Sequence, residues 1–229
     1  MRARRLLVVC AVSLGSCQSV VDPAGPIPPP SLAKAGGSIT VTLIGPAASI
    51  ANSVNAAGQV AGQLGGPFET NHAFVWTPTT PRGSTGTLAD IGTLGGAGAY
   101  VAGINAAGWV VGGTADAAGT NVAFLWTSAG GMKGSNVPAK AAQDVNDAGQ
   151  VVGPVGLRIA RWTASIASDG SLQASDYEEL PALPGAGSTA AFAINEPGQA
   201  VGWSVLERTT RFCGPVPAAD GSSKISVSQ

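Results

Sequence analysis

Charged residues are scarce in this chain of 229 residues: Lys and Arg contribute 12, Asp and Glu contribute 13, and the net charge is −1. A nucleic-acid-binding protein needs a dense basic face to neutralise phosphates, so the composition argues against a nucleic-acid partner. Histidine occurs once, as His72, and no cluster of cysteines or carboxylates at ligand spacing accompanies it. The sequence therefore predicts no metal site, and His72 is expected to have a structural role.

Cysteine is almost as rare, with three copies at Cys10, Cys17 and Cys213. Cys10 lies in an N-terminal apolar segment and Cys17 directly after it, so Cys213 has no expected disulfide partner. One histidine in the whole chain gives Cys213 no evident base, and we expect an unpaired thiol without a catalytic role. The glycine-rich residues 92–98 lack the Lys-Ser/Thr ending of a phosphate-binding loop and indicate turns. No catalytic and no cofactor-binding residue is predicted.

A hydrophobic run long enough to span a bilayer is also missing from the N-terminus, where the apolar residues 6–14 are too few for a mature transmembrane helix. Three arginines precede this run, a pattern typical of an export signal. The run ends in Leu-Gly-Ser-Cys at Cys17, which resembles the lipobox of bacterial lipoproteins, whose cysteine is acylated. The sequence predicts a lipoprotein signal peptide over residues 1–16 and a lipid on Cys17. The alternative is an ordinary secretory signal in which Cys17 is incidental.

Prolines cluster directly after this cysteine and deny a helix or a sheet ladder there. Residues 17–37 are therefore expected to be a lipid-anchored spacer, and residues 38–229 the folded domain. The lipid would be the link to a membrane, since the domain offers no polybasic patch. Gln18 stands where similar Gram-negative lipoproteins retained in the inner membrane carry Asp, so a Gram-negative host would favour the outer membrane.

Glycine, in contrast, is abundant with 33 copies, and eight of them belong to a repeated sequence motif. The motif consists of an apolar residue, Asn, two variable residues, Gly, one further residue, an apolar pair and a final Gly. The Asn and first Gly recur in all four copies, as Asn55 and Gly58, Asn105 and Gly108, Asn146 and Gly149, and Asn195 and Gly198. The asparagines are separated by 50, 41 and 49 residues, a spacing typical of propellers and arrays.

The repeated motif predicts a β-hairpin, because Asn suits the first position of a type I turn and Gly suits the left-handed residue that follows. These asparagines and glycines are therefore expected to be structural turn residues. The fourth copy carries Pro197, which is disfavoured at the third turn position. We expect a type II turn there and a register that differs by one residue.

Two further strands are expected after each hairpin. Each third strand ends in an aromatic residue, and the four segments are residues 72–76, 122–126, 158–162 and 208–212. A fourth strand is clearest at residues 88–96 and weaker at 177–184, whereas residues 130–138 have little β-forming pattern. Short antiparallel strands with two apolar faces must be covered by neighbouring repeats. The predicted fold is all-β, a β-propeller-like array of about four antiparallel blades.

Closure of that array has several solutions. Residues 39–46 resemble an outer strand without a hairpin of its own and could complete the last blade. Residues 224–228 are the rival strand for this place. An open array, or a dimer that completes a larger ring, is the alternative to closure within one chain.

The chain resembles the bacterial HAF-repeat family in three segments. They are His72-Ala73-Phe74-Val75-Trp76, Leu88-Ala89-Asp90-Ile91-Gly92-Thr93-Leu94-Gly95-Gly96, and the second copy of the repeated motif at Asn105. The resemblance covers roughly residues 39–212 and weakens in the third and fourth copies, where Arg-Ile-Ala and Arg-Thr-Thr replace His-Ala-Phe. It implies an exported protein with propeller-like repeats, and it carries over no catalytic residues.

Carboxylates are the remaining candidates for chemistry. Asp144 and Asp147 flank the third repeat asparagine, and Asp176, Glu178 and Glu179 form a small cluster. Paired carboxylates could hydrolyse glycosidic bonds or bind Ca²⁺, but neither group recurs between repeats. The sequence therefore favours a non-enzymatic protein of the cell envelope or extracellular space that binds or scaffolds a glycan or protein ligand. The alternatives are an envelope glycan hydrolase or lyase, with Asp90 as a further candidate carboxylate, and a shortened relic of a longer repeat protein.

Overall fold

The computed structural model describes residues 41–46, 48–65, 70–168 and 170–206, and these residues form strands but no α-helix. Sheet 1 contains β1 (Ile50–Val54), β2 (Val60–Leu64), β3 (His72–Pro78) and β4 (Gly86–Gly92). Sheet 2 contains β5 (Gly95–Ile104), β6 (Val110–Asp116), β7 (Asn121–Thr127) and β8 (Gly131–Gly134). Sheet 3 contains β9 (Asp144–Val145), β10 (Gln150–Val155), β11 (Arg158–Ile166) and β12 (Leu172–Glu179). Sheet 4 contains β13 (Ala186–Ile194) and β14 (Ala200–Leu206).

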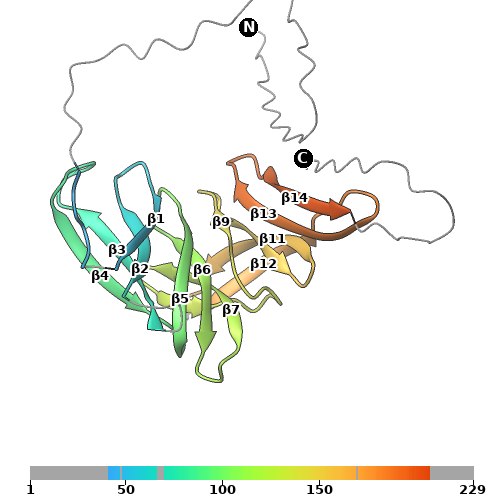
Figure 1. Ribbon diagram of the computed structural model, residues 1–229, viewed down its shortest axis with the longest axis horizontal. Helices are drawn as coiled ribbons and strands as arrows, with labels where there is room; N and C mark the ends of the chain where they lie inside the picture. The colour runs from blue at the N-terminus through green and yellow to red at the C-terminus, as the bar shows by residue number, and fades with distance from the viewer. Residues whose placement is uncertain (1–40, 47, 66–69, 169, 207–229) are drawn as a thin grey trace, which may run out of the picture.

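Each sheet is an antiparallel meander in which every strand pairs with the strand next to it in sequence. Figure 1 shows the sheets following one another from sheet 1 at the left to sheet 4 at the right. The expected all-β class with four antiparallel sheets is therefore confirmed. The expected third strands at residues 72–76, 122–126 and 158–162 are confirmed as β3, β7 and β11. The segment at 208–212 lies outside the described residues.

The first two strands of every sheet are joined by an Asn-x-x-Gly turn. In each turn the Asn N–H donates to the carbonyl oxygen four residues later, at 3.0–3.1 Å, and the Gly N–H donates back to the Asn carbonyl oxygen. The four glycines have φ between 79° and 86°, a left-handed conformation that costs a residue with a Cβ about 1–2 kcal/mol. This local chemistry fixes the same two-strand unit four times.

The fourth turn does not have the shifted register expected from Pro197. Ile194 pairs with Ala200, as Ile104 pairs with Val110 in the second repeat, so the register is the same. None of the backbone hydrogen bonds that define the turn uses the N–H of its third residue, so a proline there leaves these bonds intact.

Glycine also appears in each second strand, at the seventh residue after the repeat asparagine, for a steric reason. A Cβ on Gly112 would overlap the carbonyl oxygen of Tyr100 and come within 2.8 Å of the Phe124 ring. The facing strand β5 carries a bulge between Val101 and Gly103 at this level, which presses its backbone toward Gly112. The aromatic residue of the third strand thus packs onto a bare backbone.

Two expectations about the outer strands need correction. The segment 130–138, which has little β-forming pattern, contains β8, paired with β7 from Thr127 to Phe124. The single strand expected at 88–96 is divided, because Gly92 and Gly95 have positive φ and the chain passes there from sheet 1 to sheet 2. Backbone hydrogen bonds to a neighbouring strand override weak side-chain preference in both places.

The segment proposed to close the array does not do so in its described part. Residues 41–46 form no strand, and Val41 and Leu43 are 92% and 88% exposed. Thr42 and Ile44 lie beside Trp76 of sheet 1, at the far end of the array from sheet 4. The expectation that this segment completes the last blade is wrong for residues 41–46, and the rival segment 224–228 lies outside the described residues.

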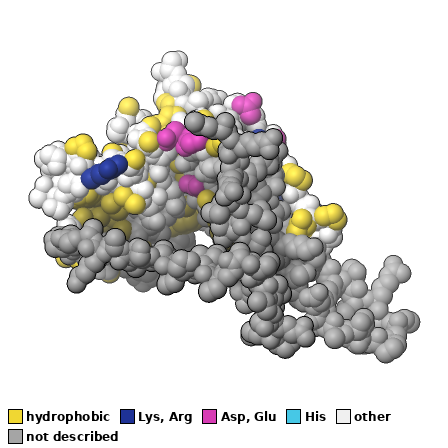
Figure 2. Space-filling view, turned by 90° about the horizontal axis from the view of Figure 1, so that it is seen from above, with side chains coloured by type: hydrophobic (Ala, Val, Ile, Leu, Met, Phe, Trp, Pro, Cys, Tyr) yellow, Lys and Arg dark blue, Asp and Glu magenta, His cyan; other side chains and the backbone are white. Residues whose placement is uncertain are grey.

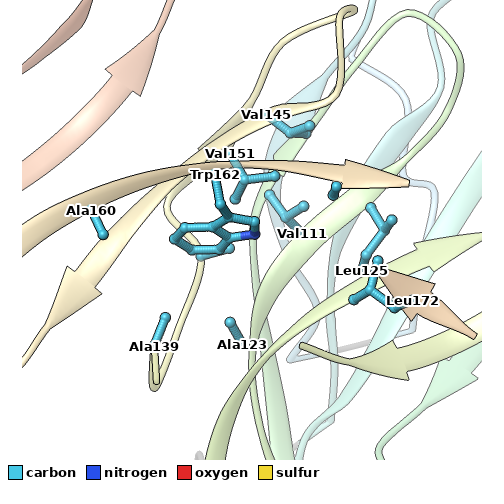
Figure 3. Close-up of a cluster of buried hydrophobic side chains, with 11 residues drawn as sticks. Val111, Ala123, Leu125, Ala139, Val145, Val151, Ala160, Trp162 and Leu172 are labelled. Atoms are coloured by element: carbon cyan, nitrogen blue, oxygen red, sulfur yellow. The ribbon is translucent and has the colours of Figure 1, made fainter. Parts of the chain in front are cut away.

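The core lies between neighbouring sheets rather than within one of them. Between sheets 2 and 3, Val111 and Leu125 cluster with Val145, Val151 and Trp162 (Figure 3). The same repeat positions cluster at the other two interfaces, where Ala61 joins Ile104 and Val110, and Val152 joins Ile194 and Ala200. One face of each sheet carries the residue before the repeat Asn and the fifth residue after that Asn, and we call it the leading face. The opposite face carries the sixth residue after the Asn, and we call it the trailing face. Every internal interface is thus a trailing face packed on a leading face.

Candidate functional site

The four Asn-x-x-Gly turns lie along one edge of the array, the upper edge in Figure 1. Their asparagine side chains form a ladder from sheet to sheet. Asn55 Nδ2 donates to the carbonyl oxygen of Asn105 at 2.9 Å, Asn105 Nδ2 to that of Asn146 at 3.1 Å, and Asn146 Nδ2 to that of Asn195 at 3.0 Å. Each asparagine Oδ1 meanwhile accepts the N–H four residues later in its own turn. One side chain therefore shapes its own turn and holds the next.

Carboxylates beside the third and fourth asparagines bind main-chain amides of neighbouring turns. Asp147 Oδ1 accepts the N–H of Ala106 at 2.7 Å, and both Glu196 oxygens accept the N–H of Asp147 at 3.1 Å. Figure 2 shows acidic side chains near the middle of this edge. Asp147 is thus engaged with the second sheet's turn, and its sequence position beside Asn146 reflects a link between repeats.

Asp144 provides another link, between sheets 3 and 4. Its two carboxylate oxygens accept the N–H groups of Val145 and Ile194, each at 2.9 Å. Burial raises the pKa of the Asp144 carboxyl above its ordinary value of 3.8, the two amide bonds lower it, and the charge of Glu196 raises it further. Both oxygens are occupied by main-chain donors, so the geometry is that of a structural carboxylate.

The other candidate carboxylates are spread over the outer strands. Asp90 on β4 pairs with His72 on β3 at 2.8 Å, and both side chains are about half exposed. Asp176, Glu178 and Glu179 lie on β12, the edge strand of sheet 3, where Glu178 forms an ion pair with Arg161. Arg161 also donates to the carbonyl oxygen of Gly198 at 2.6 Å, so this cluster also ties sheet 3 to sheet 4.

These positions do not bring the carboxylates to one place. In sheet 3 the strand order is β12-β11-β10-β9, which separates the backbone of Asp144 on β9 from that of the β12 carboxylates by about 14 Å. Glycosidases need two carboxylates about 5–9.5 Å apart. Among the described residues no group of three His, Cys, Asp or Glu side chains is placed to hold a metal ion.

A pocket opens on the turn edge between sheets 2 and 3. Its volume is about 350 Å³, and Trp109 forms one wall beside the β7–β8 turn at Ser128 and the β11–β12 turn at Ser168. The remaining lining residues are Ala107, Thr127, Ala129, Gly130, Ile166, Ala167 and Gly170, and none of the lining residues is charged. The pocket is open to solvent, and its aromatic wall and hydroxyl groups are residue types that small-ligand sites also contain.

Local chemistry explains why Trp109 stands at this pocket. Its N–H donates to Asn105 Oδ1 at 2.9 Å, which fixes its backbone at the end of the turn. The ring lies over Gly149 of the next repeat, where a Cβ would approach it to 3.3 Å. The sequence interpretation did not select Trp109, although it is the only aromatic residue at a position where the other three repeats have Gln. That departure from the repeat pattern was the available signal.

Several sequence predictions remain predictions, because they concern residues outside the described part of the chain. They are the signal peptide over 1–16, the lipid on Cys17, the spacer over 17–37 and the unpaired Cys213. Within the described ranges no helix has the length and apolar character needed to cross a membrane. No family model, no curated protein and no solved structure matches the chain.

Proposed function

We propose that this chain is an exported repeat protein of the bacterial cell envelope, held to a membrane by a lipid on Cys17, and that its repeat domain binds or scaffolds a ligand. The supporting sequence order is an export signal, a cysteine in a lipobox-like context, a proline-rich spacer and then the repeats. The outer membrane is the proposed site in a Gram-negative host.

We also propose that the four sheets are blades of the β-propeller type, as the resemblance to the HAF-repeat family implies. The proposal is supported by three consecutive four-stranded antiparallel meanders and a two-stranded hairpin, each packed face to face on the next through the same repeat positions. The turn edge then corresponds to the face on which propellers present their loops.

The observation that carries the binding proposal is the uncharged pocket beside Trp109. An indole ring offers a flat apolar surface that fits the C–H face of a sugar ring, and the exposed Ser128 and Ser168 offer hydroxyl groups to sugar hydroxyls. A charged ligand would find no countercharge among the lining residues. An uncharged glycan is therefore the proposed ligand, with a protein segment as the second candidate.

The test is a thermal melt of the full chain with and without uncharged cell-envelope glycan fragments, since a ligand that binds only the folded state raises the melting temperature. The matched variant is Trp109→Gln, because Gln occupies the equivalent position at Gln59, Gln150 and Gln199 and fits the turn. We expect a ligand-induced shift for the parent chain and none for Trp109→Gln. The ligand-free melting temperature of Trp109→Gln should be lower, because the Trp109 ring packs against the core between sheets 2 and 3. Equal shifts in the two proteins would place binding elsewhere, and no shift in either would favour the protein ligand.

Anchoring has its own measurement. The mass of the mature protein from its native envelope is expected to show acyl groups on an N-terminal Cys17, and Cys17→Ser is expected to release the protein from membranes. A mature chain with an unmodified cysteine would contradict the lipid anchor and leave an ordinary secretory signal.

A further inference from the structure

The leading face of sheet 1 is uncovered at positions that are buried in the other sheets. The residue before the repeat asparagine is 7% exposed at Ile104, 4% at Val145 and 8% at Ile194, but Val54 is 65% exposed. In each buried case the preceding sheet covers the residue. Sheet 1 is the first described sheet, so no described sheet precedes it.

The trailing face of sheet 4 is uncovered in the complementary way. The sixth residue after the asparagine is 0–1% exposed at Ala61, Val111 and Val152, but Val201 is 40% exposed. Alternate residues of a strand share one face, so Val201, Trp203 and Val205 form a row along β14. All three are exposed, and an apolar row of this kind marks an interaction surface.

The hydrogen-bond ladder stops at the same place. Asn55 and Asn146 each donate from Nδ2 both to the glutamine four residues later and to the carbonyl of the next repeat asparagine. Asn195 makes the first bond, to Gln199 at 3.0 Å, but the described residues offer it no carbonyl of a following repeat. Among the described residues, the second N–H of the Asn195 amide therefore lacks the inter-repeat acceptor that the equivalent asparagines have.

A hollow on sheet 1 is shaped by the same repeat positions. It has a volume of about 560 Å³ and is lined by Val54, Val60 and Trp76, with Thr42 and Ile44 at its side. Trp76 is itself 6% exposed, close to the 2% of its equivalent Trp162 in sheet 3, so the uncovered part of this face lies around Val54. Figure 2 shows apolar side chains gathered on the side of the molecule that carries sheet 1.

We infer that the trailing face of sheet 4 docks on the leading face of sheet 1 in a second copy of this chain, so that Val201 packs against Val54 and Val60 and Asn195 Nδ2 donates to the carbonyl oxygen of Asn55. The two faces are the two halves of an interface that the chain already forms three times. Sheets 1 and 4 lie at opposite ends of one copy, with sheets 2 and 3 between them (Figure 1). The contact joins two different surfaces, so it either closes a ring of copies or continues as an open chain of them.

The experiment measures the molar mass of the full chain by light scattering over a range of concentrations. Two charge variants each damage one face, Val54→Glu and Val201→Glu, and Leu157→Glu is the control. Leu157 is 64% exposed, close to the 65% of Val54, but it lies in the turn between β10 and β11, away from both faces. We expect the parent chain and Leu157→Glu to form oligomers, and each face variant to weaken association at least tenfold.

Mixing the two face variants distinguishes this contact from other dimers. The Val54→Glu chain keeps an intact trailing face and the Val201→Glu chain an intact leading face, so an equimolar mixture should form a dimer of one copy of each. A monomeric parent chain, an undiminished oligomer of either variant alone, or a monomeric mixture would each overturn the inference.

A cross-linking variant covers the case in which a charge disturbs folding. The double variant Val54→Cys with Val201→Cys, oxidised and compared with the parent chain and both single variants, should give covalent dimers and larger species. Cross-linking only within one chain would mean that the array closes on itself, and no cross-linking beyond the parent's background would mean that the faces do not meet. Either result would overturn the inference.

Discussion

Replacing Asn105 with aspartate tests whether the asparagine ladder holds the sheets together. Asn105 is 5% exposed, accepts the Trp109 N–H at Oδ1 and donates from Nδ2 to the Asn146 carbonyl at 3.1 Å. Asn105→Asp keeps the size of the side chain and the acceptor within the turn. It replaces the donor to sheet 3 with a carboxylate oxygen that faces a carbonyl oxygen.

The expected loss follows from these two changes. One lost hydrogen bond costs about 1 kcal/mol, and a buried polar group left without its partner adds about 1–3 kcal/mol, so the free energy of unfolding should fall by about 2–4 kcal/mol at pH 7. At about 2–4 °C per kcal/mol for a domain of this size, the melting temperature should fall by roughly 4–16 °C. Burial and the facing carbonyl should raise the pKa of the introduced carboxyl, whose protonated form can donate again. The loss should therefore shrink as the pH is lowered toward 4.

Asn195→Asp is the matched control. Asn195 accepts the Gln199 N–H at 2.8 Å within an equivalent turn, but it is exposed and donates to no following repeat among the described residues. Thermal and urea melts of both variants at pH 7 and pH 4, at a concentration where the chain is monomeric, should show a loss for Asn105→Asp several times that for Asn195→Asp. Equal losses, or a loss at Asn105 that is independent of pH, would refute the role assigned to the ladder.

Two further predictions concern packing and titration. Gly112→Ala should lower the free energy of unfolding by about 3 kcal/mol, because its Cβ would overlap the Tyr100 carbonyl and press on Phe124. The control Gly119→Ala should lower it by only about 1–2 kcal/mol, since Gly119 has a φ of 79° but no atom within 4 Å of the added Cβ. Denaturant melts check both, and equal losses would contradict the close approach of β5. Asp144 should titrate above 3.8 by NMR, and Glu196→Gln should lower its midpoint. Because the pKa in the folded state is raised, the stability contributed by Asp144 is present below pH 3.8 and is lost as the pH rises through the folded-state pKa. An NMR titration midpoint of Asp144 at or below 3.8 would contradict this prediction.

The hairpins were predictable from the sequence because their causes are local. An Asn-x-x-Gly segment carries its own turn hydrogen bonds, and the apolar run that ends at Trp76 or Trp126 favours a strand without reference to distant residues. The strand β8 was not predictable from its residues, since Gly131–Gly134 is held by pairing with β7.

The links between repeats could not be predicted for a related reason. Asn105 reaches Asn146 across 41 residues, and Asp144 reaches Ile194 across 50, so each bond depends on how two sheets stack. The sequence indicated the asparagines as turn residues, which explains the hydrogen bond that Oδ1 accepts within the turn. It did not indicate the bond that Nδ2 donates to the next repeat. The pocket beside Trp109 likewise arises from two turns that are distant in sequence.

The acceptor of each ladder bond is a main-chain carbonyl, which every amino acid has. A repeat therefore needs only its own asparagine to hold its successor, and the successor needs no matching side chain to be held. Duplication or deletion of one whole repeat would leave every junction with the same donor and the same acceptor. The ladder by itself therefore lets the number of repeats change in single steps without a new donor or acceptor at the junction. The bonds of Asp144, Asp147, Arg161 and Glu196 are specific to their junctions and would be lost or exchanged in such a step.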